Sequence, residues 1–480
     1  MEGLNEKKVM SGAFWATIDR IISMGAQFLT NLILARILTP SDFGCIGMLA
    51  IFVVVAQTII DGGFGSALIQ KKEPTQTDYS TIFYWNILFS LGLYLILFAF
   101  APVIASFYRM PLLENVLKVL GIILVVNALG VIQINRLRKQ LSFKIIAIVN
   151  IVSYFISALV AIIMALNGCN VWSLVALQLL YSLLSVASFW VCTKWYPALC
   201  FSIQSLKELF SFGGFLLFSN ILQEICKNLQ GLIIGRRFSS VEMGLYAQAK
   251  KLGDVTSYTL PNVIVQVMFP VYSQLQSDII RLRNTLRRNV RIISWFTFPI
   301  MILLILVAES LILFLYGDKW AAAIPYFQLL CIGGLFVCLQ NINYYAIAAL
   351  GKSRVLFGWS FYKWGMLLLL LLVGMHWGMV GILCGMIISE LNIYVVNALL
   401  VSKYVHYSLL RQCLDLFPVL ILSVLVGIVI YIGNCVWNLS ILIQILFYLA
   451  LYLSLSLTFY ADIRKDVNKV VTFLIHKRNG

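Results

Sequence analysis

Residues 11–38 read SGAFWATIDRIISMGAQFLTNLILARIL, a stretch apolar enough for a membrane helix that nevertheless contains Asp19, Arg20, Gln27 and Asn31. In a helix, Arg20, Gln27 and Asn31 are spaced by seven and four residues, so they share one face. Ionisable groups at membrane depth are energetically costly and normally face a bundle interior or a water-filled cavity. The stretch therefore predicts a helix that lines a polar lumen.

The composition extends this reading to the whole chain. Of 480 residues, 61% are hydrophobic and only 11% are charged, too few charges to cover the surface of a soluble protein of this length. Apolar runs of about 20 residues, the length of a spanning helix, recur from end to end. We expect an all-α polytopic membrane protein with about fourteen spans: residues 11–38, 43–69, 79–105, 116–134, 145–166, 171–193, 211–235, 244–272, 292–316, 321–350, 355–375, 378–401, 414–432 and 436–460.

The placement of the basic residues predicts the orientation. The chain carries 35 Lys and Arg and a net charge of +16. Most of them fall in alternate connections and in the two termini, whereas the opposite connections hold only Arg109, Arg236, Arg237 and Lys319. This is the positive-inside pattern, which places both termini in the cytoplasm. The charge therefore indicates membrane orientation and not a nucleic-acid partner.

An internal repeat appears when the chain is shifted by 200 residues. Residues 35–44 then fall on residues 235–244, and an Arg, an acidic residue and a Gly coincide. Six expected spans separate the two copies, so both would have the same orientation, as in transporters built from parallel repeats.

The repeat divides the chain into an N-lobe, a C-lobe and a C-terminal extension. An amphipathic interfacial helix near Ser205 marks the expected start of the C-lobe. The extension contains two almost purely apolar helices and a basic tail. The expected limits are 1–204 for helices 1–6, 205–405 for helices 7–12 and 406–480 for helices 13–14 with the tail.

Cations and amides in the helices are the candidate substrate-binding groups. Two of the cations have local acidic neighbours, since Lys227 follows Glu224 by three residues and Lys250 precedes Asp254 by four. These pairs either neutralise each other or leave surplus positive charge for a phosphate-bearing substrate. The candidates are Arg20, Gln27, Asn31, Lys227, Lys250 and Lys251.

Acidic residues in the helices are candidates for proton or cation coupling, with charge balance as the alternative. They are Asp19, Asp61, Glu224 and Asp254. Lys363 and Glu390 are expected to form a structural pair between the eleventh and twelfth helices.

The sequence offers no motif for catalysis, a metal or a cofactor. Gly351-Lys352-Ser353 lacks the earlier glycine of a phosphate loop, and the three histidines lie outside the expected helices. No cluster of Cys and His has the spacing of a metal site, and no external connection is long enough for a catalytic domain. We therefore expect a transporter and not an enzyme.

Several motifs resemble those of a known family. Residues 12–15, GAFW, and residues 34–44, LARILTPSDFG, resemble the opening of bacterial polysaccharide repeat-unit flippases. Residues 206–213, LKELFSFG, followed by Ser219 and Asn220, resemble the start of their second lobe. These flippases belong to the multidrug/oligosaccharidyl-lipid/polysaccharide export superfamily. Within it the chain is most similar to exporters of the lipopolysaccharide, O-antigen and colanic-acid type.

The resemblance implies a V-shaped pair of six-helix lobes with two extra helices in the bacterial inner membrane. Such a protein moves an undecaprenyl-diphosphate-linked oligosaccharide from the cytoplasmic to the periplasmic leaflet by alternating access. Its partners would be that glycolipid, membrane lipid and, as candidates, polysaccharide-assembly proteins. A cationic lumen suits a diphosphate, and an apolar helix pair suits a polyprenyl tail. The alternative is a cation-coupled drug or small-molecule antiporter of the same superfamily.

Overall fold

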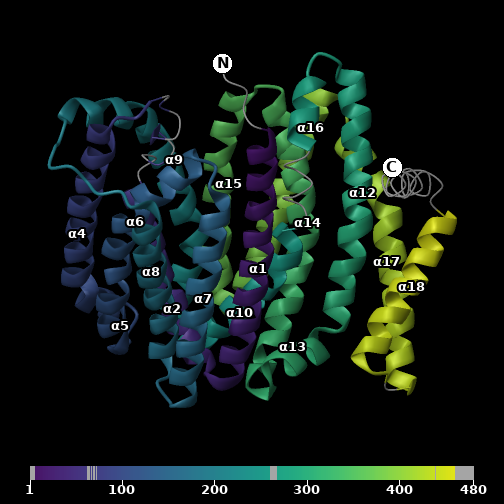
Figure 1. Ribbon diagram of the computed structural model, residues 1–480. Coiled ribbons are helices and arrows are strands. Elements are labelled where there is room, and N and C mark those ends of the chain that lie inside the picture. The colour runs from purple at the N-terminus through teal and green to yellow at the C-terminus, as the bar shows by residue number, and fades with distance from the viewer. Residues whose placement is uncertain are drawn as a thin grey trace. The chain divides into compact units, whose positions relative to one another are not determined.

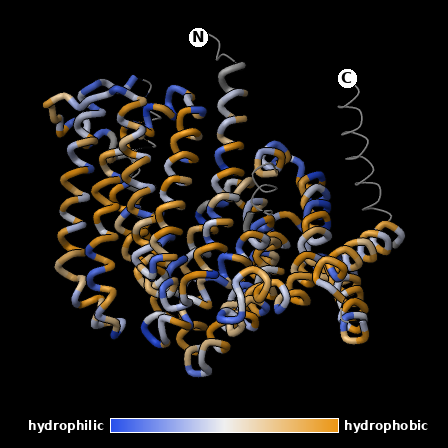
Figure 2. The backbone as a smooth tube through the Cα atoms, turned by 60° about the horizontal axis from the view of Figure 1, so that its bottom comes forward, coloured by the Kyte–Doolittle hydropathy of each residue, from blue (hydrophilic) through white to orange (hydrophobic). Residues whose placement is uncertain are grey.

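The chain is an all-helical, multi-pass membrane protein. The computed structural model describes residues 6–61, 65, 67–68, 71, 73–259, 268–437 and 439–459, and within these ranges every regular element is a helix. Ten helical segments of this part are long and apolar enough to cross a membrane. Figure 2 shows hydrophobic residues along most of the helices and hydrophilic stretches mainly at their ends. The expected fold class is confirmed, whereas the count of fourteen spans stays a prediction.

The chain divides into two compact units, Met1–Gly244 and Leu245–Gly480. In the first unit, α1 packs along α7, α7 along α8, and α2 along α9 (Figure 1). Its helices are α1 (Glu6–Ile37), α2 (Pro40–Asp61), α4 (Gln76–Phe107), α5 (Leu112–Leu120), α6 (Ile122–Lys139), α7 (Phe143–Leu166), α8 (Val171–Thr193) and α9 (Ile203–Arg237). Helix α10 (Ser240–Asp254) begins in this unit and continues into the second.

In the second unit, α14 and α15 both pack along α16, and α12 packs against α14 and α17. Its remaining elements are η1 (Val255–Thr259), α12 (Ile279–Leu306), α13 (Ala308–Tyr316), η2 (Asp318–Ala323), α14 (Ile324–Ala349), α15 (Ser353–Gly374), η3 (Met375–Trp377), α16 (Gly378–Val405), α17 (Leu409–Trp437) and α18 (Ile441–Phe459).

Three elements differ from the sequence-based expectation. The interfacial helix near Ser205 is not a separate element, because α9 runs without interruption for 35 residues and contains no proline. The basic inner segment before the ninth span is the helical beginning of α12, capped by Asp278, whose carboxylate accepts from the main-chain nitrogen of Arg281 at 3.0 Å. In the eighth span, α10 ends at Asp254 and gives way to the π-helical turn η1.

Small residues allow close helix packing in the first unit. The first turns of α2 and α10, which occupy equivalent positions of the 200-residue repeat, meet through the hydroxyl oxygens of Ser41 and Ser240, 2.7 Å apart.

In the second unit, a hydrogen bond attaches the last helix to α12. Tyr452 of α18 donates its hydroxyl to the main-chain oxygen of Trp295 in α12 at 2.9 Å, and both rings are buried.

Candidate functional site

The polar stripe of α1 divides into an exposed and a buried part. Arg20 and Gln27 are exposed, and in the described part of the chain neither makes a hydrogen bond or an ion pair. Asn31, one turn further on, is only 8% exposed. A guanidinium that has no protein partner retains its hydrogen-bond donors for an external anion. Of the three stripe residues, Arg20 and Gln27 are therefore the ones that a ligand can reach.

Asp19 is held at the junction of three helices in the first unit. Its carboxylate accepts from the hydroxyl of Ser23 and from the side-chain amide of Asn150 in α7, both at 3.1 Å. Tyr181 of α8 donates to the oxygen of Asn150 at 3.5 Å. Asn150 and Tyr181 were not among the sequence candidates, although each is a polar residue in a largely apolar helix. The arrangement holds the carboxylate of Asp19 in a defined position between α1 and α7.

Asp61 terminates a second polar network, which joins α2, α6 and α8. Gln57 donates to Asp61 at 3.1 Å and accepts from Asn127 at 3.0 Å. Asn127 in turn accepts from the hydroxyl of Ser182. Asp61 itself is exposed, so this network connects a surface carboxylate with the helix-packing interior of the first unit.

The predicted local pair on α9 is confirmed. The Nζ of Lys227 lies 2.9 Å from Oε1 of Glu224, and the two side chains are 49% and 26% exposed. Exposed pairs of this kind add little to stability because water screens them. Glu224 therefore neutralises Lys227 locally without immobilising it strongly.

The second unit contains the other cations. The Nζ of Lys250 lies 5.8 Å from the ring centre of Tyr246, and the charges of Asp254 and Glu390 both act on it. Lys251, the next residue on α10, is exposed. Lys250 thus lies among acidic and aromatic groups, whereas Lys251 points to the surface of the unit. The π-helical turn that follows Asp254 is an irregularity frequent at functional sites.

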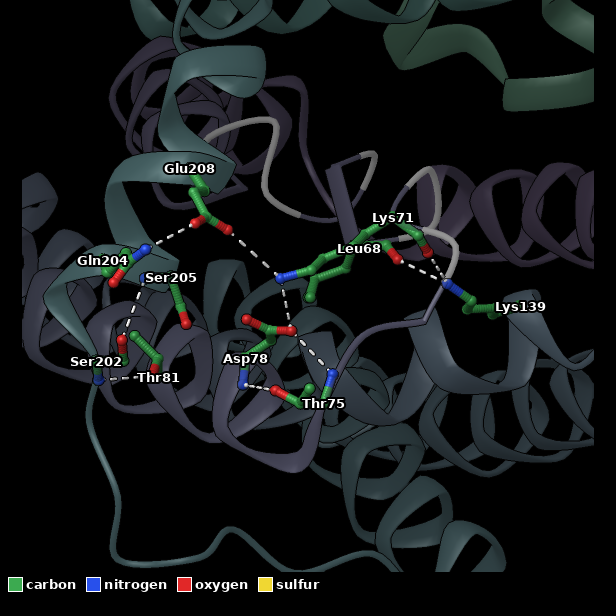
Figure 3. Close-up of polar contacts among 10 residues, drawn as sticks. All are labelled: Leu68, Lys71, Thr75, Asp78, Thr81, Lys139, Ser202, Gln204, Ser205 and Glu208. Carbon is green, nitrogen blue, oxygen red and sulfur yellow. Dashed lines mark hydrogen bonds and ion pairs between the residues drawn. The ribbon is translucent and has the colours of Figure 1, made fainter.

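A charged cluster that sequence reasoning missed lies at the beginning of α4 (Figure 3). The Nζ of Lys71 lies 2.9 Å from Oδ2 of Asp78 and 3.7 Å from Oε2 of Glu208 in α9. Asp78 and Thr75 also form a reciprocal cap, because Thr75 N donates to Asp78 at 2.8 Å and Asp78 N to Thr75 at 3.2 Å. Lys139 of α6 donates to the main-chain oxygens of Leu68 and Lys71. We call Lys71, Asp78 and Glu208 the ionic latch.

The connection before α9 is fastened beside this latch. Ser202 N donates to Thr81 Oγ1 at 3.0 Å, and Ala198 N to Ser80 Oγ at 2.9 Å. Trp195 is 5% exposed and donates to Gln76 at 2.7 Å. The start of α9 is therefore attached to α4 by both main-chain and ionic contacts.

A second missed cluster lies where α12 meets α17. Asp415, with a side chain 4% exposed, accepts from Nε and Nη2 of Arg287 at 2.7 and 2.8 Å and from Nε of Arg291 at 2.9 Å. The hydroxyl of Tyr407 donates to it at 2.8 Å. The expectation that the last two helices carry almost no polar residue is wrong at this point, because the first two turns of α17 contain Gln412 and Asp415, both buried.

Comparison with known proteins identifies relatives of this chain. It matches the sequence model described as "Polysaccharide biosynthesis protein" over residues 33–325. It is 28% identical over 360 residues to the teichuronic acid biosynthesis protein TuaB of Bacillus subtilis (strain 168), covering 74% of each chain. It is 28% identical over 361 residues to the succinoglycan biosynthesis transport protein ExoT of Rhizobium meliloti (strain 1021), covering 74% of this chain and 72% of that one. It is 24% identical over 439 residues to the lipopolysaccharide biosynthesis protein WzxC of Escherichia coli (strain K12), covering 88% of each.

Solved structures show the same fold. The lipid II flippase MurJ in an inward closed conformation superimposes with a TM-score of 0.74 at 14% identity, covering 95% of this chain and 99% of that one. An inward-facing MATE-family multidrug resistance transporter of the MOP superfamily gives a TM-score of 0.60 at 12% identity, covering 80% and 98%. At such identities the likeness concerns the fold alone.

Proposed function

This chain belongs to the polysaccharide biosynthesis protein family, and from that premise we propose that it is a flippase for a lipid-linked oligosaccharide. The substrate we propose is an undecaprenyl-diphosphate-linked repeat unit, moved from the cytoplasmic to the periplasmic leaflet by alternating access. The observation that carries the proposal is the family match over residues 33–325. The relatives named above support it, since ExoT is described as a transport protein and WzxC as a lipopolysaccharide biosynthesis protein.

The charges in the helices suit the diphosphate of this substrate. Arg20 is exposed and has no partner in the described part of the chain, and Lys251 is exposed on α10. A diphosphate needs several cationic donors, and a guanidinium binds phosphate oxygens in a bidentate manner. We propose phosphate-binding groups in each unit separately: Arg20 in the first, with Lys227 as a weaker one because Glu224 neutralises it, and Lys250 and Lys251 in the second.

Two other features suit the remainder of a glycolipid. The amides of Gln27 and Asn31 on α1 match the hydroxyl groups of sugars. Helices α17 and α18 expose a largely apolar surface that matches a polyprenyl tail. Its exposed residues include Leu425, Ile428, Val429, Leu446 and Phe447.

We assign ion coupling to the first unit, at Asp19. Its carboxylate is oriented by Ser23 and Asn150, whereas Asp61 is exposed and Glu224 is paired with Lys227. In the second unit Asp254 acts on Lys250 and balances its charge. We therefore rank Asp19 above Asp61, Glu224 and Asp254 as the coupling residue.

An antiporter of the same superfamily is the second candidate, favoured by the fold shared with the MATE transporter and by the oriented carboxylate of Asp19. It predicts binding of organic cations. The surplus of exposed cations on α1 and α10 favours an anionic substrate instead.

The number of membrane spans, their grouping into lobes and the orientation of the termini are part of the same proposal. We propose fourteen spans, with α1, α9 and α10 as the more polar ones, arranged as two six-helix lobes and a C-terminal pair. Both termini would lie in the cytoplasm, as the distribution of Lys and Arg predicts. Polysaccharide-assembly proteins remain candidate partners.

Binding to the purified protein separates the two candidates. Native mass spectrometry would compare a lipid-linked diphosphate oligosaccharide with a cationic dye, for the wild type, Arg20→Glu, Lys251→Glu and the control Lys207→Glu. Lys207 is an exposed cation outside the proposed binding set. We expect glycolipid binding that both test variants lose and the control keeps. Binding of the dye alone would overturn the proposal.

A further inference from the structure

Polar residues line the contact between α14 and α16 in the second unit. Gln340 and Asn343 lie three residues apart on α14, and Glu390, Tyr394 and Asn397 lie four and seven apart on α16. At these spacings each set shares one face of its helix, and the two helices pack along each other (Figure 1). We call these five residues the polar seam.

Hydrogen bonds join the seam across the helices and extend it to α17. Gln340 donates its amide to Oε2 of Glu390, and Asn397 donates to the main-chain oxygen of Gln340 at 3.1 Å. Further along, Asn343 and Tyr394 both donate to Oε1 of Gln412, at 3.0 and 3.3 Å. The seam therefore continues into the helix that carries Asp415.

The three amide oxygens of the seam, in contrast to its amide donors, are not satisfied. The side-chain oxygens of Gln340, Asn343 and Asn397 have no hydrogen-bond partner in the described part of the chain, although these residues are only 5%, 0% and 2% exposed. A buried acceptor without a donor destabilises a protein, and a network that served only to join two helices would be better apolar or fully paired. The three unpaired oxygens can accept hydrogen bonds from a molecule rich in donors, such as a protonated water.

Glu390 is the only acidic residue among the five, and charges from two other helices act on it. These are Lys250 and Asp254 of α10 and Lys363 of α15. Lys250 also faces Tyr246. The positive charges of two lysines acting on one carboxylate disfavour a bound metal cation, whereas a proton needs only one carboxylate oxygen. The charges around Glu390 therefore favour binding of a proton over binding of a metal cation.

The seam reaches the surface at the end that we assign to the cytoplasm. Gln412 donates to the main-chain oxygen of Tyr407 at 3.4 Å, and the hydroxyl of Tyr407 donates to Asp415. Asp415 is paired with Arg291 and with Arg287, whose side chain is 46% exposed. Arg281, Arg283 and Arg288 of α12 and Arg411 of α17 add further charge at the same end. Polar groups thus follow one another from the surface to Glu390.

We propose that Glu390 is a proton-binding site reached from the cytoplasmic face along the polar seam, and that its protonation strengthens the hold of Lys250 on an anionic substrate. When Glu390 and Asp254 are both ionised, their two negative charges balance those of Lys250 and Lys363. Uptake of one proton by the carboxylate of Glu390 leaves one positive charge in excess, which a phosphate group can meet. This coupling rests on the proposed function, whereas the proton site itself does not.

The proton site is tested without any substrate. Infrared difference spectra between acid and alkaline pH would be recorded for the wild type, Glu390→Gln and the control Glu309→Gln, an exposed acid of α13. We expect a carboxylic-acid carbonyl band that only Glu390→Gln loses. Gln340→Leu retains Glu390 but removes its hydrogen-bond donor, so the carbonyl band should shift. This variant tests the assignment even if Glu390→Gln fails to fold. A wild-type band that survives in Glu390→Gln, or that Gln340→Leu leaves in place, would overturn the assignment.

The route and the coupling are tested separately. After transfer to heavy water, the band should exchange several-fold more slowly in Asn343→Leu than in the wild type, and equal rates would exclude the seam as the route. The ionisation of inorganic pyrophosphate itself affects both proteins equally. Beyond that shared effect, the wild type should bind it roughly tenfold more tightly at acid than at alkaline pH, and Glu390→Gln should lack this extra change. Pyrophosphate binding with the same pH dependence in both proteins would exclude the coupling. If the infrared band is present but lipid-linked oligosaccharide never binds, the proposed function fails while the proton site stands.

Discussion

Gly44 and Gly244 are equivalent positions of the 200-residue repeat, and each packs against the main chain that carries the other. A Cβ added at Gly44 would lie 1.8 Å from the carbonyl oxygen of Ser240, and one added at Gly244 would lie 1.8 Å from that of Pro40. Pro40 and Ser240 are themselves equivalent in the repeat. The contact is therefore reciprocal, which supports the repeat as a structural one at this point of the first unit.

Substitution at either glycine tests this close approach. Gly44→Val or Gly244→Val must separate two main chains, so we expect a loss of about 1–3 kcal/mol or more and a lower melting temperature in detergent. Gly92 is the matched control, since nothing lies within 4 Å of its added Cβ. Gly92→Ala should melt at or slightly above the wild-type temperature. Normal melting of Gly44→Val would show that the helices do not meet there.

Asp415 should be the main anchor of α17. Asp415→Asn removes the charge that Arg287 and Arg291 share, and we expect a loss of about 2 kcal/mol, below the ~3–5 of a fully buried pair because the arginines are partly exposed. Tyr407→Phe removes one hydrogen bond to the same carboxylate and should cost about 1 kcal/mol. Thermal unfolding would measure both, with Arg281→Gln, from an exposed pair, as the control. Equal melting of Asp415→Asn and Arg281→Gln would contradict the anchor.

The ionic latch should be insensitive to pH in the neutral range. The carboxylate of Asp78 hydrogen-bonds the Lys71 ammonium and raises the pKa of Lys71 above its usual value. A group whose pKa is raised by folding contributes its full stabilisation below its unfolded pKa, about 10.4, and loses it as the pH rises through the folded value. The melting difference between the wild type and Lys71→Met should therefore be the same at pH 6 and pH 9. It should be small, since the Lys71 side chain is 32% exposed. A difference that vanishes by pH 9 would contradict this ion pair.

Asn150 should orient Asp19 for ion coupling. Asn150→Leu removes one of the two donors to its carboxylate, so we expect the dependence of transport on the proton or sodium gradient to change while protein yield is retained. Asp19→Asn should reduce that dependence further, and the proton dependence that remains should be the part carried by Glu390. Asn167→Leu, an exposed position at the end of α7, serves as the control. If Asp19→Asn transports with an unchanged ion dependence, coupling lies elsewhere.

The sequence was most informative where a contact is local. The polar stripe of α1 and the pair Glu224–Lys227 follow from helical periodicity, and composition alone indicates a membrane protein. Arg287 and Asp415, in contrast, are 128 residues apart in the chain, and Asn150 is 131 residues from Asp19. No periodic pattern relates such residues, because tertiary packing brings them together. Glu390 was expected to pair with Lys363, and its hydrogen bond to Gln340, 50 residues away, became visible only in the fold.

Movement of a lipid-linked oligosaccharide between the two leaflets can be measured directly in sealed vesicles that contain this protein. A lipid-linked oligosaccharide would be placed on one side, and its exposure on the other would be followed with a glycan-modifying enzyme that does not cross the membrane. We expect the wild type and Lys207→Glu to accelerate exposure, whereas Arg20→Glu and Lys251→Glu should not. If Arg20→Glu and Lys251→Glu still accelerate exposure, the protein is a flippase but these two residues do not bind its substrate. An exposure rate equal to that of protein-free vesicles for every lipid-linked glycan tested would contradict the flippase itself.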